Sequence, residues 1–229
     1  MATEDIFEPL RRQMVEEIAA ETRILSAQLG RAALADRVIE VMGRVPRHAF
    51  VPAEVRPFAY INSPLPIGHG KTISQPFIVA VMTDLLDVGD QSAVLEIGTG
   101  FGYQAAVLAE LARQVYSVEI IEEIAVQGKK RLASLGYKNI ALRVGNGALG
   151  WPEHAPYDRI IVTAAPDLIP PALLNQLKAG GKMVIPSGIP DQQQLILVEK
   201  SKEGRISTRE ILAVRFSELE EPTGLAGRG

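Results

Sequence analysis

Residues 94–104 read VLEIGTGFGYQ and place glycines at positions 98, 100 and 102 directly after an apolar run. An apolar run that ends in closely spaced glycines is typical of a buried strand followed by a tight turn into a helix. Glycine adopts backbone angles closed to other residues and lets the main chain approach a ligand without an intervening β-carbon. The stretch therefore predicts a ligand-binding turn at the carboxyl end of a strand.

Helical and strand patterns alternate on the C-terminal side of position 76. The expected helices cover 77–86, 103–112, 121–135 and 170–179, and the expected strands cover 93–98, 114–120, 140–145, 157–165, 180–188, 194–200 and 205–216. Such alternation predicts parallel strands joined by right-handed crossovers, and the last two strands resemble an antiparallel hairpin. The fold class expected is α/β, a doubly wound, mostly parallel, seven-stranded Rossmann-like sheet with helices on both faces.

The N-terminal part is expected to add helices to this sheet. Apolar residues recur at intervals of four within residues 4–43, namely Ile6, Leu10, Met14 and Ile18, then Leu34, Val38 and Met42. Residues 45–76 carry prolines at 46, 52, 57, 64, 66 and 76, which favours an ordered but irregular segment. We expect one domain over 1–229, made of a helical cap with a substrate loop (1–76), a cofactor-binding core (77–190) and a C-terminal hairpin and tail (191–229).

Composition narrows the function further. The chain has 229 residues, 47% of them hydrophobic, and a net charge of -3, so no strongly basic surface is expected and nucleic acid is not an expected partner. There is no cysteine, and the three histidines (48, 69 and 154) are scattered, so neither a thiolate nucleophile nor a metal site is expected. The polar opening residues and the lack of a bilayer-length apolar run predict a cytoplasmic protein without a membrane partner. A monomer is expected.

The spacing of the glycine turn departs from that of a dinucleotide site. It reads E-x-G-x-G-x-G from Glu96 to Gly102, and a carboxylate at the strand end would repel a diphosphate but suit a ligand that bears a cation. Glu119 ends the next strand, where a carboxylate commonly binds two ribose hydroxyls. Asn146 and Gly147 follow the third strand, where an amide and bare main chain could contact adenine. Together these features favour S-adenosylmethionine, although each alone is compatible with a ligand-free turn or an exposed glutamate.

A missing residue type and a missing motif disfavour two classes of methyl acceptor. A cytosine C5 methyltransferase needs a cysteine nucleophile, which is absent. An exocyclic amine methyltransferase usually carries an Asn/Asp-Pro-Pro-aromatic motif after the fourth strand, where this chain has VTAAP at 162–166. Both kinds of nucleic-acid methyltransferase are therefore disfavoured.

Residues 65–86 read LPIGHGKTISQPFIVAVMTDLL, follow RVPRHAFVP and precede the glycine turn. From about Val38 to Ser187 the chain resembles the protein-L-isoaspartate O-methyltransferases, with T-I-S-Q-P beside this glycine turn as the most specific feature. The resemblance implies methyl esterification of the free α-carboxylate of L-isoaspartyl residues in damaged proteins and peptides, with S-adenosylhomocysteine as the other product. The ester then closes to a succinimide, and hydrolysis of the succinimide regenerates some normal aspartate.

The resemblance also implies roles for individual residues. Ser74 is the expected catalytic residue and contacts the substrate, although its hydroxyl could equally cap the following helix. His69 is a candidate substrate contact, with packing or surface exposure as the alternative. Lys71 stands where glutamine is expected, and simple exposure is the alternative for it. The expected cofactor contacts are Thr72, Ile73, Ser74, Glu96, Gly98, Thr99, Gly100, Gly102, Glu119, Asn146 and Gly147.

Three departures from the family pattern keep alternatives open. Asn62 and Asn146 stand where aspartate is expected, and VRFSELEEP at 214–222 replaces VRFVPL. The altered ending adds three carboxylates where the family forms its peptide groove, so peptide preference could differ. Two other interpretations remain: a methyltransferase of this fold with another small-molecule or protein acceptor, and a non-catalytic S-adenosylmethionine-binding module.

Overall fold

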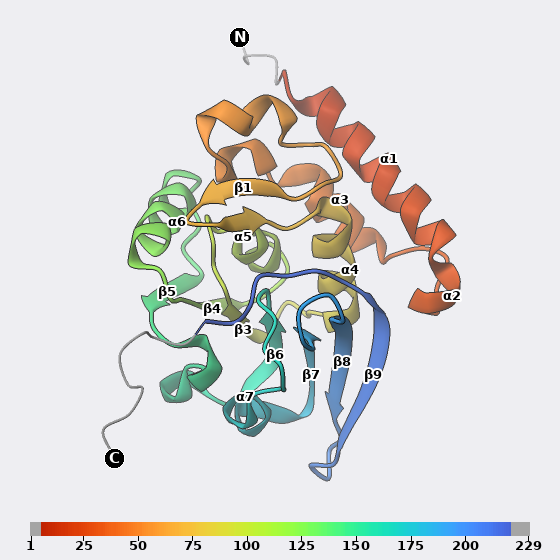
Figure 1. The fold of residues 1–229 in the computed structure, drawn as a ribbon, viewed down its shortest axis with the longest axis vertical. Coiled ribbons are helices and arrows are strands. Elements are labelled where there is room, and N and C mark those ends of the chain that lie inside the picture. Colours follow the sequence, from red (N-terminus) through yellow and green to blue (C-terminus); the bar gives the residue numbers. More distant parts are fainter. Residues whose placement is uncertain (1–5, 221–229) are drawn as a thin grey trace.

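A seven-stranded sheet forms the centre of the computed structural model, which describes residues 6–220 (Figure 1). Its strands lie in the order β5-β4-β3-β6-β7-β8-β9. They are β3 (Ala93–Ile97), β4 (Gln114–Glu119), β5 (Ile140–Val144), β6 (Tyr157–Val162), β7 (Leu177–Ser187), β8 (Gln194–Lys200) and β9 (Ile206–Ala213). Only β8 runs against its neighbours, since β7–β8 and β8–β9 pair antiparallel and the other pairs are parallel. The predicted α/β fold with a C-terminal antiparallel hairpin is confirmed.

The two faces of the sheet are covered unequally. One face packs against α1 (Glu8–Ile24), α2 (Ser26–Leu29), α3 (Asp36–Arg44), α4 (Pro76–Leu86), α5 (Tyr103–Ala109) and α6 (Glu122–Ser134). The other carries α7 (Pro171–Gln176) and the short 3-10 turns η3 (Gly147–Leu149) and η4 (Pro152–His154). The prediction of helices on both faces is confirmed, with most of the helical mass on one face.

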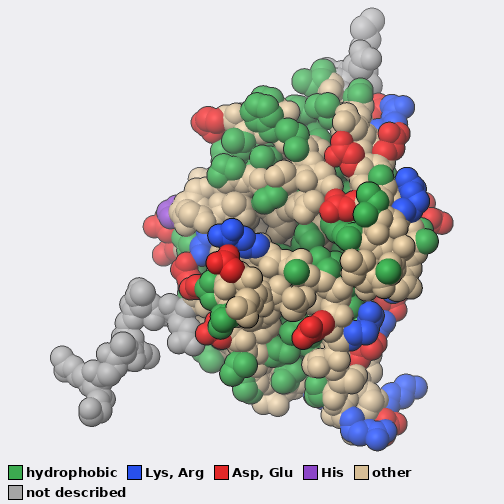
Figure 2. All heavy atoms as spheres, turned by 45° about the vertical axis from the view of Figure 1, so that its right-hand side comes forward, with side chains coloured by type: hydrophobic (Ala, Val, Ile, Leu, Met, Phe, Trp, Pro, Cys, Tyr) green, Lys and Arg blue, Asp and Glu red, His purple; other side chains and the backbone are tan. Residues whose placement is uncertain are grey.

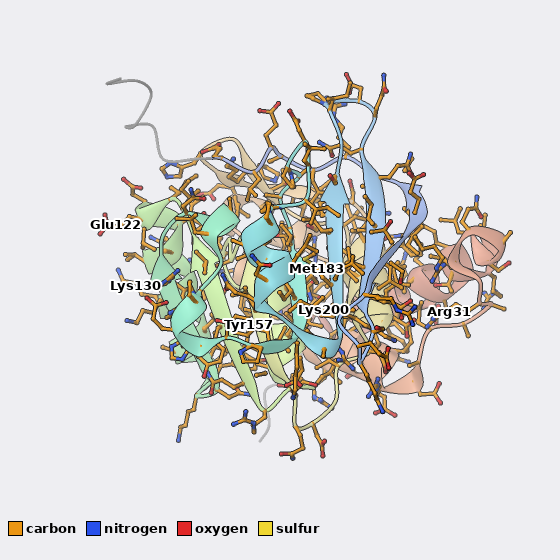
Figure 3. The ribbon with its side chains drawn as sticks, turned by 90° about the horizontal axis from the view of Figure 1, so that it is seen from below. Arg31, Glu122, Lys130, Tyr157, Met183 and Lys200 are labelled. Atoms are coloured by element: carbon orange, nitrogen blue, oxygen red, sulfur yellow. The ribbon has the colours of Figure 1, made fainter. Side chains whose placement is uncertain are left out.

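Alternation along each strand sends side chains into two separate hydrophobic cores. In β3, Val94 belongs to the core beneath α4 and α5, whereas Leu95 and Ile97 belong to the core on the α7 side. Met183 and Tyr157 lie within the protein in Figure 3 and are fully buried. A sheet buried on both faces is expected for parallel strands linked by helical crossovers.

The N-terminal prediction is confirmed in part. Met14 and Ile18 of α1 are fully buried, but Ile6 and Leu10 are exposed, so the apolar stripe of this helix reaches the core only from Met14 onward. The helical region is not continuous. A left-handed Gly30 (φ 69°) ends α2, and α3 starts six residues later at Asp36.

The proline-rich segment contains more regular structure than expected. It forms two 3-10 helices, η1 (Arg47–Phe50) and η2 (Ala53–Phe58), and then an antiparallel hairpin of β1 (Leu65–Gly68) and β2 (Lys71–Ile73). Left-handed Gly68, His69 and Gly70 allow the tight turn between the two strands. In Figure 1 the hairpin lies across one edge of the main sheet, near α5.

Two predicted helix ends are wrong. The helix expected over 103–112 ends at Ala109, and the one expected over 170–179 ends at Gln176. At the second site the Gln176 side chain accepts a hydrogen bond from Trp151 N (2.8 Å) and donates one to Leu149 O (2.9 Å). Leu177 then turns to an extended conformation and pairs with Tyr157 in β6. The side-chain contacts of Gln176 are tertiary and leave no mark in the local sequence pattern.

The surface is mixed in charge on the face shown in Figure 2, where lysine and arginine are interspersed with aspartate and glutamate. Within residues 6–220, no helix has both the length and the apolarity needed to cross a bilayer. The same residues contain no cluster of three or more histidine and acidic side chains that could hold a metal ion.

Candidate functional site

The glycine turn lies where the strand order reverses. β4 and β5 extend the sheet on one side of β3, and β6 and β7 extend it on the other. Gly98 N donates to Val118 O at 2.8 Å, and its φ of 92° is left-handed. A β-carbon at Gly98 would lie 2.4 Å from Thr163 Oγ1, so the close approach of β3 and β6 requires glycine there. The predicted position of the turn, at the end of the first parallel strand, is confirmed.

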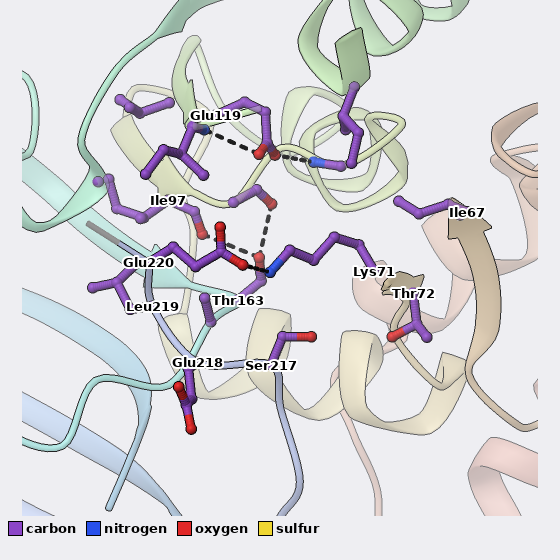
Figure 4. Close-up of a pocket in the computed structure, with 17 residues that line it drawn as sticks. Ile67, Lys71, Thr72, Ile97, Glu119, Thr163, Ser217, Glu218, Leu219 and Glu220 are labelled. Carbon is purple, nitrogen blue, oxygen red and sulfur yellow. Dashed lines mark hydrogen bonds and ion pairs between the residues drawn. The ribbon is translucent and has the colours of Figure 1, made fainter. Parts of the chain in front are cut away.

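A cavity of about 570 Å³ opens beside this turn (Figure 4). Its walls are mostly apolar, and its main polar side chains are Glu119, Thr163, Lys71 and Glu220. Six parts of the chain form it: the β1–β2 hairpin, the end of β3 with its turn, the end of β4 with the start of α6, the loop at Gly147, residues 163–164 after β6, and residues 217–220. We call this the nucleoside cavity, after the ligand that the sequence predicts for it.

Glu119 joins the wall of the nucleoside cavity to the glycine turn. One carboxylate oxygen accepts a hydrogen bond from Gly100 N at 2.8 Å, and the other accepts from Ile120 N at 3.0 Å and Ile121 N at 3.1 Å. A carboxylate oxygen can accept more than one hydrogen bond, so Glu119 can hold the turn and still receive ligand hydroxyls. The structure therefore brings Glu119 together with the turn, as the sequence spacing predicts.

The two predicted contacts Asn146 and Gly147 have different positions in the structure. Gly147 lines the nucleoside cavity, and a β-carbon there would lie 2.3 Å from Ile97 Cγ2. Asn146 is not among the lining residues, and its side-chain oxygen accepts a hydrogen bond from Ala148 N at 2.9 Å. Asparagine thus caps the η3 turn that presents Gly147, a role that an amide oxygen fills as well as a carboxylate.

The structure places Glu96 behind the glycine turn, outside the cavity walls. Its side chain is fully buried and accepts a hydrogen bond from Ser117 Oγ, which lies 2.6 Å from Thr99 Oγ1. The other carboxylate oxygen has no partner in the described chain. Burial raises the pKa of Glu96 to about 8. The arrangement suits a neutral acid that links β3, β4 and the turn, rather than a carboxylate that faces a ligand cation.

A second cavity, of about 400 Å³, adjoins the first. Its polar lining residues are Thr72, Ser74, Thr99, Tyr103, Gln104 and Thr163. The two cavities share Ile67, Thr72, Gly98, Gly100 and Thr163 as lining residues. We call the second one the acceptor cavity, and it meets the nucleoside cavity at the glycine turn.

Ser74 lines the acceptor cavity, and its hydroxyl does not cap α4. The N-cap residue of α4 is Gln75, which makes no side-chain cap. Asn62 takes that role from a distant loop, because its side-chain oxygen accepts a hydrogen bond from Phe77 N at 3.0 Å. Within the described residues no hydrogen bond involves the Ser74 hydroxyl, which leaves it available to a ligand.

Of the remaining predicted contacts, two lie outside the two cavities and three line them. His69 occupies the β1–β2 turn with a φ of 52° and lines a separate open depression with Glu54, Phe101 and Arg131. Gly102 begins α5, where a β-carbon would lie 2.9 Å from Leu132 Cγ, so its role is close packing against α6. Thr72, Ile73 and Thr99 line the acceptor cavity, and Thr72 also lines the nucleoside cavity.

Residues 217–220, which we call the closing segment, form a wall of the nucleoside cavity that the sequence did not assign to it. Ala165 N donates to Ser217 O at 2.8 Å, and Leu219 N donates to Ala165 O at 2.9 Å. The Lys71 ammonium lies 2.5 Å from a Glu220 carboxylate oxygen and ties the segment to the β1–β2 hairpin (Figure 4). Glu218 and Glu220 thus lie at the nucleoside cavity, and Glu221 lies outside the described residues.

Comparison with known proteins identifies the family. A family model described as protein-L-isoaspartate(D-aspartate) O-methyltransferase matches residues 21–223. Protein-L-isoaspartate O-methyltransferase 1 of Polaromonas sp. is 63% identical over 219 residues, covering 96% of this chain and 93% of the relative. The enzyme of the same name from Cupriavidus necator is 57% identical, covering 95% of this chain and 85% of the relative.

Solved structures agree with the fold. A protein-L-isoaspartate O-methyltransferase structure superposes with a TM-score of 0.78 at 27% identity, covering 92% of this chain and 67% of the other. A Plasmodium falciparum structure named for the same family, in complex with S-adenosyl-L-homocysteine, superposes with a TM-score of 0.77 over 92% of this chain and 98% of the other, and at 22% identity supports the fold alone. The chain belongs to the protein-L-isoaspartate(D-aspartate) O-methyltransferase family.

Proposed function

We propose that this chain transfers a methyl group from S-adenosylmethionine to the free α-carboxylate of L-isoaspartyl residues in damaged proteins and peptides. The observation that carries the proposal is the junction of two cavities at the glycine turn, with Glu119 on one side and Ser74 on the other. A donor and an acceptor that meet at such a junction are held in line for displacement. The products are the methyl ester, which begins repair through a succinimide, and S-adenosylhomocysteine.

The nucleoside cavity fits the donor. Glu119 offers carboxylate oxygens to ribose hydroxyls, and Gly98 and Gly100 let the main chain approach the ligand closely. Apolar side chains of Ile97, Ile120 and Leu219 suit the faces of an adenine ring. S-adenosylmethionine supplies a methyl group on a positively charged sulfur, which makes that methyl group electrophilic.

The acceptor cavity needs to position an anion and exclude water. A carboxylate acceptor is already ionised near neutral pH, so no general base is required. We propose that the Ser74 hydroxyl donates a hydrogen bond to one carboxylate oxygen and leaves the other aimed at the nucleoside cavity. The apolar side chains of Ile67, Val79 and Phe101 help to keep water away from the attacking oxygen.

A groove beside Ser74 is the proposed site for the rest of the peptide. It has a volume of about 720 Å³ and lies between Ser74–Ile78 and residues 213–216, which form the end of β9 and the segment after it. The described acidic residues of the altered C-terminal sequence, Glu218 and Glu220, line the nucleoside cavity instead of this groove. We therefore propose that the altered ending acts mainly on cofactor binding and less on peptide preference.

The proposed reaction is tested with labelled S-adenosylmethionine and two peptides that differ only in an isoaspartyl or a normal aspartyl linkage. The isoaspartyl peptide is expected to gain a base-labile label, and the aspartyl peptide is expected to stay unlabelled. Equal labelling of both peptides would contradict the proposed specificity. Cofactor binding without transfer to any acceptor would support the non-catalytic alternative.

Replacing Ser74 by alanine is expected to lower kcat/KM for the isoaspartyl peptide by about 10- to 100-fold, the range for one hydrogen bond to a charged group. Affinity for S-adenosylhomocysteine should change less than about threefold, because Ser74 lines the acceptor cavity and not the nucleoside cavity. Steady-state kinetics and calorimetry measure the two effects. Ser63→Ala, which removes a nearby hydroxyl outside both cavities, is the control. A loss of cofactor affinity with intact turnover would reverse the assignment.

Replacing Glu220 by glutamine is expected to speed release of S-adenosylhomocysteine about two- to fivefold at low salt. The change removes the 2.5 Å ion pair with Lys71 that holds the closing segment, and a half-exposed pair is worth at most about 1 kcal/mol. Stopped-flow displacement measures the rate, and added salt should bring the wild type toward the variant. Glu153→Gln, which breaks the remote pair with Arg143, should leave release unchanged. Equal release rates at low salt would show that the pair does not hold the segment.

Several expectations stay predictions. They are a cytoplasmic location, a monomeric state, the lack of nucleic-acid and membrane partners, and the division of the single domain at residues 76 and 190. Size-exclusion chromatography with light scattering would test the oligomeric state.

A further inference from the structure

Arg47 carries a fully buried guanidinium on the 3-10 helix η1. Its Nε donates to Ala59 O at 2.8 Å, and its Nη2 donates to Ser74 O at 2.7 Å and to Ser63 O at 3.5 Å. All of these partners are main-chain carbonyls. Arg47 thus links the loops on both sides of the β1–β2 hairpin to the residue proposed to hold the acceptor.

No carboxylate balances this charge within the described residues. The guanidinium carbon lies 4.9 Å from the centre of the Tyr103 ring, and Nη1 is buried without a hydrogen-bond partner. The titratable neighbours are the phenols Tyr60 and Tyr103. Burial lowers the pKa of Arg47 to about 10 and raises that of Tyr103 to about 12, so at neutral pH the arginine is charged and Tyr103 is not.

A buried charge without a counter-ion is costly, so its position is informative. Both Ser74 and Tyr103 line the acceptor cavity, and Arg47 contacts both from behind. The cation therefore lies directly behind the wall against which an acceptor would rest. Glu96, the buried acid behind the glycine turn, has a raised pKa and contributes little negative charge at neutral pH. The Glu21 carboxylate, on the α1 side of Ser74, already accepts hydrogen bonds from Asn62 Nδ2 at 2.6 Å and Gln75 Nε2 at 3.4 Å.

We propose that Arg47 is a positioning residue that fixes the main chain at Ser74 and makes the acceptor cavity selective for an anionic acceptor. This inference rests on the proposed function, because it supplies the charge that would favour a carboxylate over a neutral group. In a site with little water, a cation behind the cavity wall attracts an anion more strongly than it would in bulk solvent. The charge of Arg47 gains an anionic partner only when the acceptor carboxylate binds.

The test compares two peptides, one with an isoaspartyl α-carboxylate and one with the α-carboxamide in its place. Their dissociation constants are measured by calorimetry in the presence of S-adenosylhomocysteine, so that no reaction occurs. The wild type is expected to bind the carboxylate peptide at least about tenfold more tightly. Arg47→Met should reduce this preference to about twofold or less, with affinity for S-adenosylhomocysteine within about threefold of the wild type.

The preference ratio separates charge selectivity from simple structural damage, because a distorted loop would weaken both peptides alike. Arg44→Met is the control. Arg44 lies three residues before Arg47 in the sequence, is exposed and pairs with Glu110, so this variant should leave the ratio unchanged. A wild type that binds neither peptide, or shows no preference, would contradict the proposed function itself. A wild type with the preference and an Arg47→Met variant that retains it would overturn the role of Arg47 alone.

If Arg47→Met does not fold, Arg47→Lys tests whether the charge at position 47 sets the carboxylate preference. Lysine keeps the charge near neutral pH but loses its proton more readily than arginine when buried. The variant should keep the carboxylate preference at pH 7 and lose it by pH 9.5, while the wild type keeps it at both. A preference that does not change with pH in the lysine variant would overturn the inference.

Discussion

Replacing Glu119 by alanine is expected to weaken binding of S-adenosylhomocysteine by at least about 100-fold. The carboxylate accepts hydrogen bonds from Gly100 N, Ile120 N and Ile121 N while it lines the nucleoside cavity. Its removal takes away the proposed partner of the ribose hydroxyls and leaves the Gly100 amide without its acceptor. Hydrogen bonds to charged groups are worth about 1.5–3 kcal/mol each, so the loss of two accounts for the expected change.

Calorimetric titration of S-adenosylhomocysteine measures this effect. Glu119→Gln should bind with intermediate affinity, because its amide oxygen accepts as before but its NH₂ group cannot accept. Glu122→Ala is the matched control, since Glu122 is exposed on α6 and points outward in Figure 3. Binding by Glu119→Ala within threefold of the wild type would remove Glu119 from the cofactor site.

Replacing Glu96 by glutamine is expected to stabilise the protein increasingly as the pH rises. Burial raises the pKa of Glu96 from 4.5 to about 8, so the folded state binds one proton more than the unfolded state between these values. Wild-type stability from this group is complete below pH 4.5 and falls as the pH rises toward 8. At about 1.4 kcal/mol per pH unit, the loss reaches about 5 kcal/mol at most. Glutamine has no such proton to lose.

Urea unfolding at pH 5 and pH 8.5 measures the effect. The free energy of unfolding of Glu96→Gln minus that of the wild type should increase by several kcal/mol between the two pH values. This comparison cancels the cost of an unpartnered amide group, which is the same at both. Glu203→Gln, at an exposed turn, should show no such increase. A difference that does not change with pH would mean that Glu96 is ionised in the folded protein.

Local pattern predicted the elements whose identity depends on nearby residues. The glycines at 98, 100 and 102 placed the turn, and the apolar runs on both sides placed the strands that carry Glu96 and Glu119. Helix ends were less predictable because tertiary contacts decide them. At Gln176 the decisive hydrogen bonds go to Trp151 and Leu149, about 25 residues away.

The residues of the candidate site were likewise predictable only in part. Gly98, Gly100, Gly147 and Glu119, which the sequence predicts to contact the cofactor, line one cavity. Glu96 could not be separated from a cavity residue by sequence, since only the direction of its side chain, toward Ser117, buries it. The ion pair of Lys71 with Glu220 joins residues 149 positions apart, and no local pattern reports it.

Arg47 is another residue whose burial could not be predicted from the sequence. An arginine in a proline-rich segment is typical of an exposed loop, yet it is fully buried against main-chain carbonyls. Asn62 replaces the expected aspartate, but its side-chain oxygen caps α4, so the Ser74 hydroxyl is not needed as the cap. The partners of Arg47 are backbone carbonyls, and the Asn62 amide joins Phe77 N to the Glu21 carboxylate, so neither set of contacts can be identified from the local sequence.

A crystal structure of the protein with S-adenosylhomocysteine and an isoaspartyl peptide measures the geometry of both ligands. The ribose hydroxyls should lie within hydrogen-bond distance of Glu119, the adenine should lie beside Gly147, and the sulfur should face the acceptor cavity. The peptide α-carboxylate should contact the Ser74 hydroxyl. A nucleoside bound elsewhere, or a sulfur that points away from Ser74, would contradict the account.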